Sequence, residues 1–193
     1  MSADRLDELA AALRLDEIEQ GRGYAPAILL LLALWGTGAR ACRASNAELM
    51  ALTTLTKREV VSALAQLEGS GLVARSYAHP GSRSGRAIHL TLCLGTPPRV
   101  AFPPAAVLEH LRAAASELRP RPAMLIATGV LAWVIAAATG GPVDGAGIRR
   151  ILGAQHGGSF SRRRRELESI IASMPADFRA STGAPASEAA GGV

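Results

Sequence analysis

Hydrophobic and polar positions follow two different periods along this chain, one typical of helices and one typical of strands. Leu6, Leu9 and Leu13 recur at helical spacing among acidic residues, which predicts an amphipathic helix within residues 1–22. Apolar and polar residues instead alternate one by one over 87–92 (AIHLTL), which predicts a half-buried strand. The pattern therefore indicates helices together with a small amount of sheet.

Two stretches carry no charge, over 25–39 (APAILLLLALWGTGA) and 123–139 (AMLIATGVLAWVIAAAT). The first is too short to cross a hydrocarbon layer of about 30 Å, and the second only reaches the lower limit. Short apolar runs of this kind are more often core helices than membrane spans. We interpret both as buried helices and expect no membrane partner.

A short helix, a threonine-rich turn and a longer helix are predicted over 46–68. Ser45 or Asn46 can cap the first helix, and Thr56 with Glu59 forms the T-x-x-E pattern of a capping box, so the second helix begins at Lys57. One face of this second helix is apolar and predicts burial: Val60, Ala63, Leu64 and Leu67.

A β-hairpin is predicted directly after these helices, with strands over 72–77 and 87–92 and the turn-rich, basic tip HPGSRSGR between them. The segment 95–104 (GTPPRVAFPP) holds four prolines, which suit neither a helix interior nor a central strand. We therefore place a domain boundary there.

The second half repeats the order of elements without clear sequence identity. Helices are predicted over 105–118, 123–138 and 146–153, followed by a glycine-rich turn and a longer basic helix over 159–174. The fold class expected is mainly α, with a helix-turn-helix and hairpin unit followed by a second, all-α helix-turn-helix-like unit. The expected domains are an N-terminal helix (1–22), a first domain (23–94), a linker (95–104), a helical domain (105–175) and a flexible tail (176–193).

Composition and charge sharpen this picture only in part. Hydrophobic residues make up 49% of the chain and aromatic residues 4%, so the core is expected to consist of leucine, isoleucine, valine and alanine. The net charge is +5, although residues 1–20 hold six acidic residues against two arginines. The basic excess elsewhere suits a polyanionic partner, but charge alone does not identify one.

Candidate chemistry for an enzyme is weak. Two cysteines and four histidines are scattered without metal-ligand or nucleophile spacing, and the phosphate-binding pattern G-x-x-x-x-G-K-[ST] does not occur. We expect no enzymatic activity, no metal and no cofactor. The acidic N-terminal stretch lacks the pattern of a signal peptide, and the two cysteines show no disulfide pattern. We therefore expect a reduced, cytoplasmic setting.

The stretch LTKREVVSALAQLEGSGLVARSYAHPGSRSGRAIHLTL resembles the recognition helix, wing and second wing strand of winged helix-turn-helix proteins, including MarR-like bacterial regulators. The likeness covers about one third of the chain. It implies a recognition helix over 57–68 that enters the DNA major groove and a hairpin tip that contacts the backbone or minor groove. The resemblance also implies that the partner is double-stranded DNA and that the protein associates with the nucleoid.

The candidate DNA-binding residues of the first domain are donors on the exposed side of the second helix and on the hairpin: Thr56, Lys57, Arg58, Ser62, Gln66, Arg75, His79, Ser82, Arg83, Ser84 and Arg86. Those of the second half are arginines: Arg149, Arg150, Arg162, Arg163 and Arg164. The alternative for each group is an ordinary solvated, basic helix or loop. Lys57 and Arg58 favour the DNA interpretation because cations at a helix start oppose the helix dipole.

The function expected is a bacterial transcriptional regulator that binds DNA as a homodimer, with the acidic first helix and the apolar helices of the second half as candidate dimer surfaces. Two alternatives stay open. A plasmid or phage replication initiator or partition factor would also bind DNA, and a winged-helix protein-interaction module would not.

Overall fold

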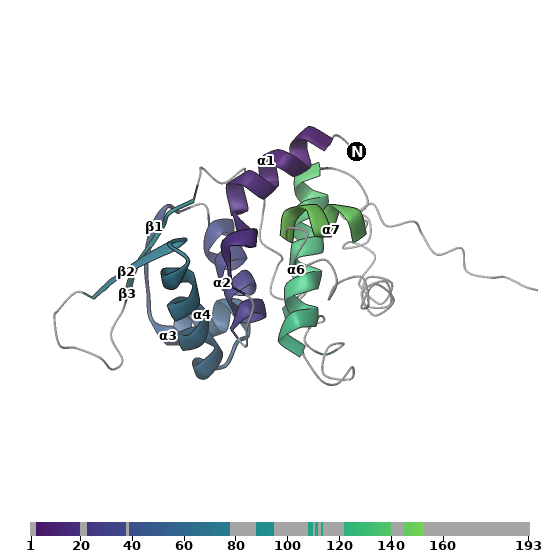
Figure 1. Ribbon diagram of the computed structural model, residues 1–193. Helices are drawn as coiled ribbons and strands as arrows, with labels where there is room; N and C mark the ends of the chain where they lie inside the picture. The colour runs from purple at the N-terminus through teal and green to yellow at the C-terminus, as the bar shows by residue number, and fades with distance from the viewer. Residues whose placement is uncertain are drawn as a thin grey trace, which may run out of the picture.

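The computed structural model describes residues 3–19, 23–37, 39–77, 88–94, 108–109, 111, 113, 122–139 and 145–152. These residues form a mainly helical protein with one small three-stranded antiparallel sheet (Figure 1). In the first half the elements are α1 (Ala3–Leu13), the 3-10 helix η1 (Leu15–Glu17), α2 (Tyr24–Gly36), β1 (Ala41–Ala44), α3 (Asn46–Thr53), α4 (Lys57–Gly69), β2 (Val73–Tyr77) and β3 (Ile88–Leu92). In the second half they are α6 (Pro122–Thr139) and α7 (Gly145–Leu152).

Helix α2 lies at the centre of the molecule. Every residue from Tyr24 to Trp35 is buried, as expected for a helix that is apolar on all sides. Helix α4 packs on one side of α2 and helix α6 on the other, while α1 runs across the end of this arrangement against α6 and α7 (Figure 1). The interpretation of both long apolar runs as core helices is therefore confirmed.

In α6, every residue from Ile126 to Leu131 is likewise buried. Among the described residues there is no helix whose length and apolar character would suffice for crossing a bilayer.

The leucine stripe of α1 is buried within the chain. Leu6, Leu9 and Leu13 are at most 3% exposed and belong to the same hydrophobic cluster as the residues of α2 and α6. The amphipathic pattern predicted the helix correctly, but this stripe is not free to form a dimer surface. The apolar side chains of α6 are also used inside the molecule.

The sheet has the strand order β1-β3-β2. The hairpin pairing is confirmed: β2 and β3 are antiparallel, with Val73 opposite Leu92 and Tyr77 opposite Ile88. Strand β1, which the sequence pattern did not predict, pairs with β3 so that Ala44 lies opposite Ile88. Its four residues, ACRA, are too few to show an alternating pattern.

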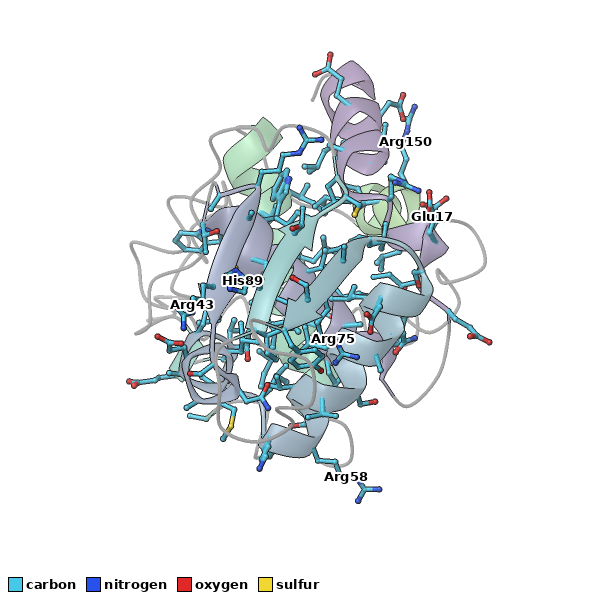
Figure 2. The ribbon with its side chains drawn as sticks, turned by 90° about the vertical axis from the view of Figure 1, so that its left-hand side faces the viewer. Glu17, Arg43, Arg58, Arg75, His89 and Arg150 are labelled. Carbon is cyan, nitrogen blue, oxygen red and sulfur yellow. The ribbon has the colours of Figure 1, made fainter. Side chains whose placement is uncertain are left out.

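One face of the sheet turns towards the core and the other towards solvent. Ile88, Leu90 and Leu92 are buried, while His89 and Thr91 between them are exposed, as their alternation predicts. His89 lies opposite Arg43 of β1, on the face turned to the viewer in Figure 2.

The predicted helix 105–118 is described only in part: Leu108, Glu109, Leu111 and Ala113 are helical, and Leu108 and Leu111 are buried. The linker 95–104, the basic helix over 159–174 and the tail 176–193 lie outside the described residues. Buried residues from both sides of the predicted linker form one hydrophobic cluster.

Candidate nucleic-acid interface

Helix α4 begins in a complete capping box, as predicted. The backbone N–H and the hydroxyl of Thr56 donate to the Glu59 carboxylate at 2.8 and 2.7 Å, and the Glu59 N–H donates back to the hydroxyl at 3.4 Å. This reciprocal arrangement satisfies groups that a helix start otherwise leaves unpaired. The Thr56 hydroxyl is therefore occupied by the cap.

The inner face of α4 holds the helix in place. Val60, Ala63, Leu64 and Leu67 are at most 1% exposed, as predicted, and α4 packs on α2, α3 and β2. Four buried apolar side chains of this size fix which face of the helix points outward.

The outer face of α4 is formed by Lys57, Arg58, Val61, Ser62 and Ala65, all exposed. Figure 2 shows Arg58 pointing away from the body of the molecule. Neither Lys57 nor Arg58 forms an ion pair within the described part of the chain. Two cationic side chains therefore stand free at the start of a firmly anchored helix.

The charge balance of this helix start is less one-sided than the two cations alone suggest. Glu59, in the same turn, supplies one negative charge where the helix dipole favours it. It offsets part of the unfavourable interaction of Lys57 and Arg58 with the dipole. A net positive charge of one remains in the turn, without an ion-pair partner among the described residues.

Gln66, one of the candidate DNA-binding residues, does not lie free on the outer face. Its side-chain amide donates to the backbone carbonyl of Glu19, and its Oε1 lies so close to Gly23 that it leaves no room for a Cβ atom there. Gln66 therefore joins α4 to the chain that leads into α2, and it is half-buried.

Arg75 of β2 is also engaged within the protein. Its Nη2 donates to the Glu68 carboxylate at 2.6 Å, and its guanidinium lies 5.7 Å from the centroid of the Tyr77 ring. The carboxylate and the ring both favour the cation where it is, so this arginine joins β2 to α4. Its charge is already offset by Glu68.

The hairpin continues from the ends of β2 and β3, at the pair Tyr77 and Ile88. The candidate residues of its tip lie outside the described residues: His79, Ser82, Arg83, Ser84 and Arg86. Their roles stay predictions.

In the second half, the structure places one candidate side chain. The Arg150 guanidinium donates through Nε and Nη2 to the two carboxylate oxygens of Asp7, so it joins α7 to α1. Arg149 belongs to α7 by its backbone, but its side chain is not described, and Arg162, Arg163 and Arg164 lie outside the described residues. Arg150 thus has an ion-pair partner on the protein itself.

Two exposed apolar side chains near this surface were not predicted. Val61 on α4 is 47% exposed and Tyr77 at the end of β2 is 49% exposed. The sequence holds a signal for Val61: it falls outside the positions of the buried face set by Val60, Ala63, Leu64 and Leu67.

No three side chains of histidine, cysteine, aspartate or glutamate gather into a metal-binding group among the residues that the structure describes. Burial raises the pKa of the Cys42 thiol, which lowers the share of the reactive thiolate.

Comparisons with protein-family models, with curated protein sequences and with solved structures found no significant match to this chain.

Proposed function

We propose that this protein binds double-stranded DNA sequence-specifically and acts as a transcriptional regulator of the winged helix-turn-helix type. In this proposal α3 and α4 form the helix-turn-helix, α4 enters the major groove, and the tip between β2 and β3 is the wing. The order of a short helix, a turn, a capped longer helix and an antiparallel hairpin supports it.

The observation that carries the proposal is the exposed start of α4. Lys57 and Arg58 extend from a helix end anchored by four buried side chains, and their charge has no ion-pair partner in the described residues. A DNA phosphate at this point would pair with both cations and interact favourably with the positive end of the helix dipole. Such contacts position a protein on DNA.

We assign the recognition of DNA bases to the next turn of α4, which holds Val61 and Ser62. The exposed Val61 methyl groups suit the methyl group of thymine. The Ser62 hydroxyl, which is exposed and lies beside Gly23, can donate to or accept from a base edge. Gln66, Arg75 and Arg150 are left out of this direct contact set because each is bonded within the protein.

The test begins with selection of bound fragments from genomic DNA, followed by a salt titration on the best site. The logarithm of the binding constant should fall steeply with the logarithm of salt concentration, and Lys57→Ala or Arg58→Ala should reduce that slope by about one each. Arg150→Ala is the matched control, since it removes one positive charge that is paired with Asp7, and it should leave the slope unchanged.

Other outcomes separate the alternatives. Enrichment of repeated sites beside an origin would indicate a replication initiator or partition factor, whereas a single palindrome over a promoter indicates a regulator that binds as a homodimer. Absence of an enriched site together with a flat salt dependence would contradict DNA binding and indicate a protein-interaction module.

A further inference from the structure

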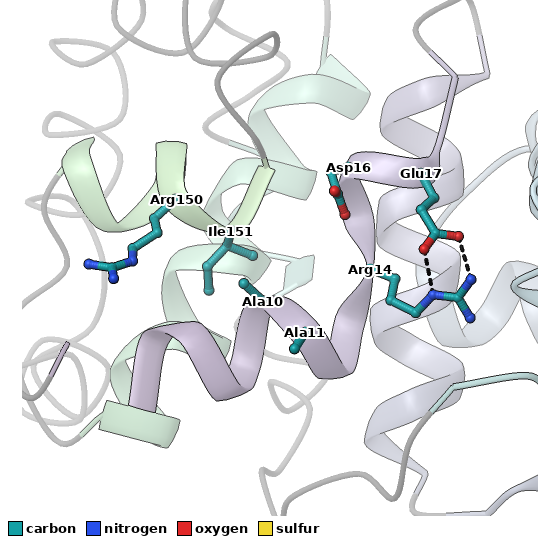
Figure 3. A pocket seen from close by; sticks show the side chains of 7 residues that line it. All are labelled: Ala10, Ala11, Arg14, Asp16, Glu17, Arg150 and Ile151. Atoms are coloured by element: carbon teal, nitrogen blue, oxygen red, sulfur yellow. Dashed lines mark hydrogen bonds and ion pairs between the residues drawn. The ribbon is translucent and has the colours of Figure 1, made fainter. Parts of the chain in front are cut away.

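A cavity of about 310 Å³ lies between α1, η1 and α7, away from the proposed DNA interface (Figure 3). Its apolar wall is made by Ala10 and Ala11 of α1 and by Ile151 of α7. The two alanines leave room that a longer side chain on α1 would fill. The volume is at the lower end of the range for small-molecule sites.

The two arginines that line this cavity are already paired. Arg14 donates to both carboxylate oxygens of Glu17, at 2.6 and 2.5 Å, and Arg150 donates to both carboxylate oxygens of Asp7. Two parallel bonds from a guanidinium to a carboxylate are the strongest geometry such a pair can adopt. An anionic ligand would have to displace one of these carboxylates.

Among the charged groups of the lining, Asp16 is the one that belongs to no ion pair of the described residues. Its carboxylate forms no ion pair or hydrogen bond within the described part of the chain. Figure 3 shows it on the opposite side of η1 from the Arg14 and Glu17 pair. This separation follows from the backbone of Arg14, whose φ of 48° turns the chain sharply from α1 into η1.

We propose that this cavity binds a small organic cation: a primary ammonium group with a short, branched aliphatic body. The ammonium group pairs with Asp16, and the aliphatic body covers Ala10, Ala11 and Ile151. A cation pairs with this carboxylate and leaves both arginine pairs intact, whereas an anion would be repelled by Asp16 and a neutral polar molecule would bring no opposite charge to it.

The position of the site gives such binding a structural consequence. The occupant contacts α1 and η1 on one side and α7 on the other, so it adds a link between the two halves of the chain. Arg14, at the rim, also donates to the backbone carbonyl of Cys93 at 3.3 Å, just after β3. A ligand that binds only the folded protein stabilises this arrangement by mass action.

The test is a titration of the full chain, labelled with ¹³C at its alanine and isoleucine methyl groups and followed by NMR at pH 7. The probe is 3-methylbutylammonium, and 3-methylbutanoate, with the same carbon skeleton and the opposite charge, is its control. The ammonium ion should shift the methyl signals of Ala10, Ala11 and Ile151 saturably, with a dissociation constant on the order of millimolar for so small a ligand. The carboxylate should not.

Two variants assign the binding to Asp16. Asp16→Asn should weaken binding of the ammonium ion about fivefold, the upper value for an ion pair open to solvent. Glu8→Gln, which removes an exposed carboxylate of α1 that does not line the cavity, should leave the affinity unchanged. The dispersed methyl signals of the other alanines and isoleucines report that each variant is folded.

The proposal is overturned by any of three results: no saturable shift at these three methyl groups, equal affinity for the two ions, or unchanged affinity in Asp16→Asn. None of these results depends on whether the protein binds DNA.

Discussion

Gly69 and Gly71 stand two residues apart at the end of α4, and their backbones differ. Gly71 has a φ of +69°, and the N–H groups of Gly71 and Leu72 donate to the carbonyls of Glu68 and Leu67. This is a Schellman ending, in which glycine avoids the steric cost of the left-handed conformation. Gly69, in contrast, is the last helical residue, with open space where a Cβ atom would lie.

We predict that alanine has opposite effects at these two positions. Gly71→Ala should lower the free energy of unfolding by about 1 kcal/mol, because alanine is strained at positive φ. Gly69→Ala should raise it by about 0.5–1 kcal/mol, because it restricts the unfolded chain and fits the helix. Urea unfolding of the two variants beside the unchanged protein measures both values. Effects of the same sign would contradict this account of the helix ending.

At the same scale, the sequence predicted which residues of α4 face inward but not what the polar ones contact. The wheel position of Gln66 is compatible with an outward role, yet its amide bonds to the carbonyl of Glu19, 47 residues earlier. Arg75 and Arg150 found acidic partners in the same way. Periodicity gives the direction of a side chain from its helix, whereas such partners depend on how distant segments pack.

Helices α3 and α4 both begin in a capping box, and the one at α3 is sensitive to pH. The Ser45 N–H and hydroxyl donate to the Glu48 carboxylate at 2.6 and 2.8 Å. These bonds, the backbone one foremost, lower the pKa of Glu48 from its ordinary value of 4.5. Because the folded pKa lies below the unfolded one, the contribution is fully present above about pH 4.5 and is lost as pH falls through the folded pKa.

Glu48→Gln should therefore destabilise the protein at pH 7 and have a diminishing effect as the pH is lowered towards 3. Urea midpoints across this range measure the difference between the variant and the unchanged protein. Ser45→Ala, which should cost about 1 kcal/mol as the loss of an N-cap, provides the control. In that background the hydroxyl bond is lost and the backbone bond to Glu48 remains, so the pH-dependent part of the Glu48→Gln effect should shrink only in part. A Glu48→Gln effect of the same size at pH 7 and pH 3 would contradict this role of the Glu48 carboxylate.

The helices and strands with a clear local sequence pattern were predicted, whereas strand β1, whose pattern is weak, was not. The starts of α3 and α4 and the strands β2 and β3 carry caps or alternation that can be read locally. Strand β1 has four residues and pairs with β3, which lies 47 residues further along. Its formation depends on that partner more than on its own sequence.

For the whole molecule, the sequence suggested two units joined by a proline-rich linker, and the structure shows buried residues of both units in one hydrophobic cluster. Helix α2 packs against α6, and α1 packs against α6 and α7. The apolar runs predicted that these helices would be buried but not against which neighbours. A shared cluster implies that the two halves unfold together.

Gly129 of α6 provides a way to test this coupling. A Cβ atom there would come within 2.5 Å of one methyl group of Leu111, which is fully buried. Crowding of this kind costs about 1–3 kcal/mol, more than the helix preference of alanine over glycine, about 1 kcal/mol, can offset. We therefore predict that Gly129→Ala lowers the stability of the second half, although glycine to alanine within a helix is ordinarily stabilising.

The chain holds two tryptophans, Trp35 in α2 and Trp133 in α6, so each half can be followed by its own fluorescence. In a Trp133→Phe background, Trp35 reports on the first half alone, and in a Trp35→Phe background Trp133 reports on the second. If the shared cluster makes folding cooperative, Gly129→Ala should lower the urea midpoint seen by Trp35 as much as the midpoint seen by Trp133, even though the added methyl group crowds only Leu111. A shift confined to Trp133 would mean that the halves unfold separately, because the first half would then keep its full stability after the second had lost part of its own.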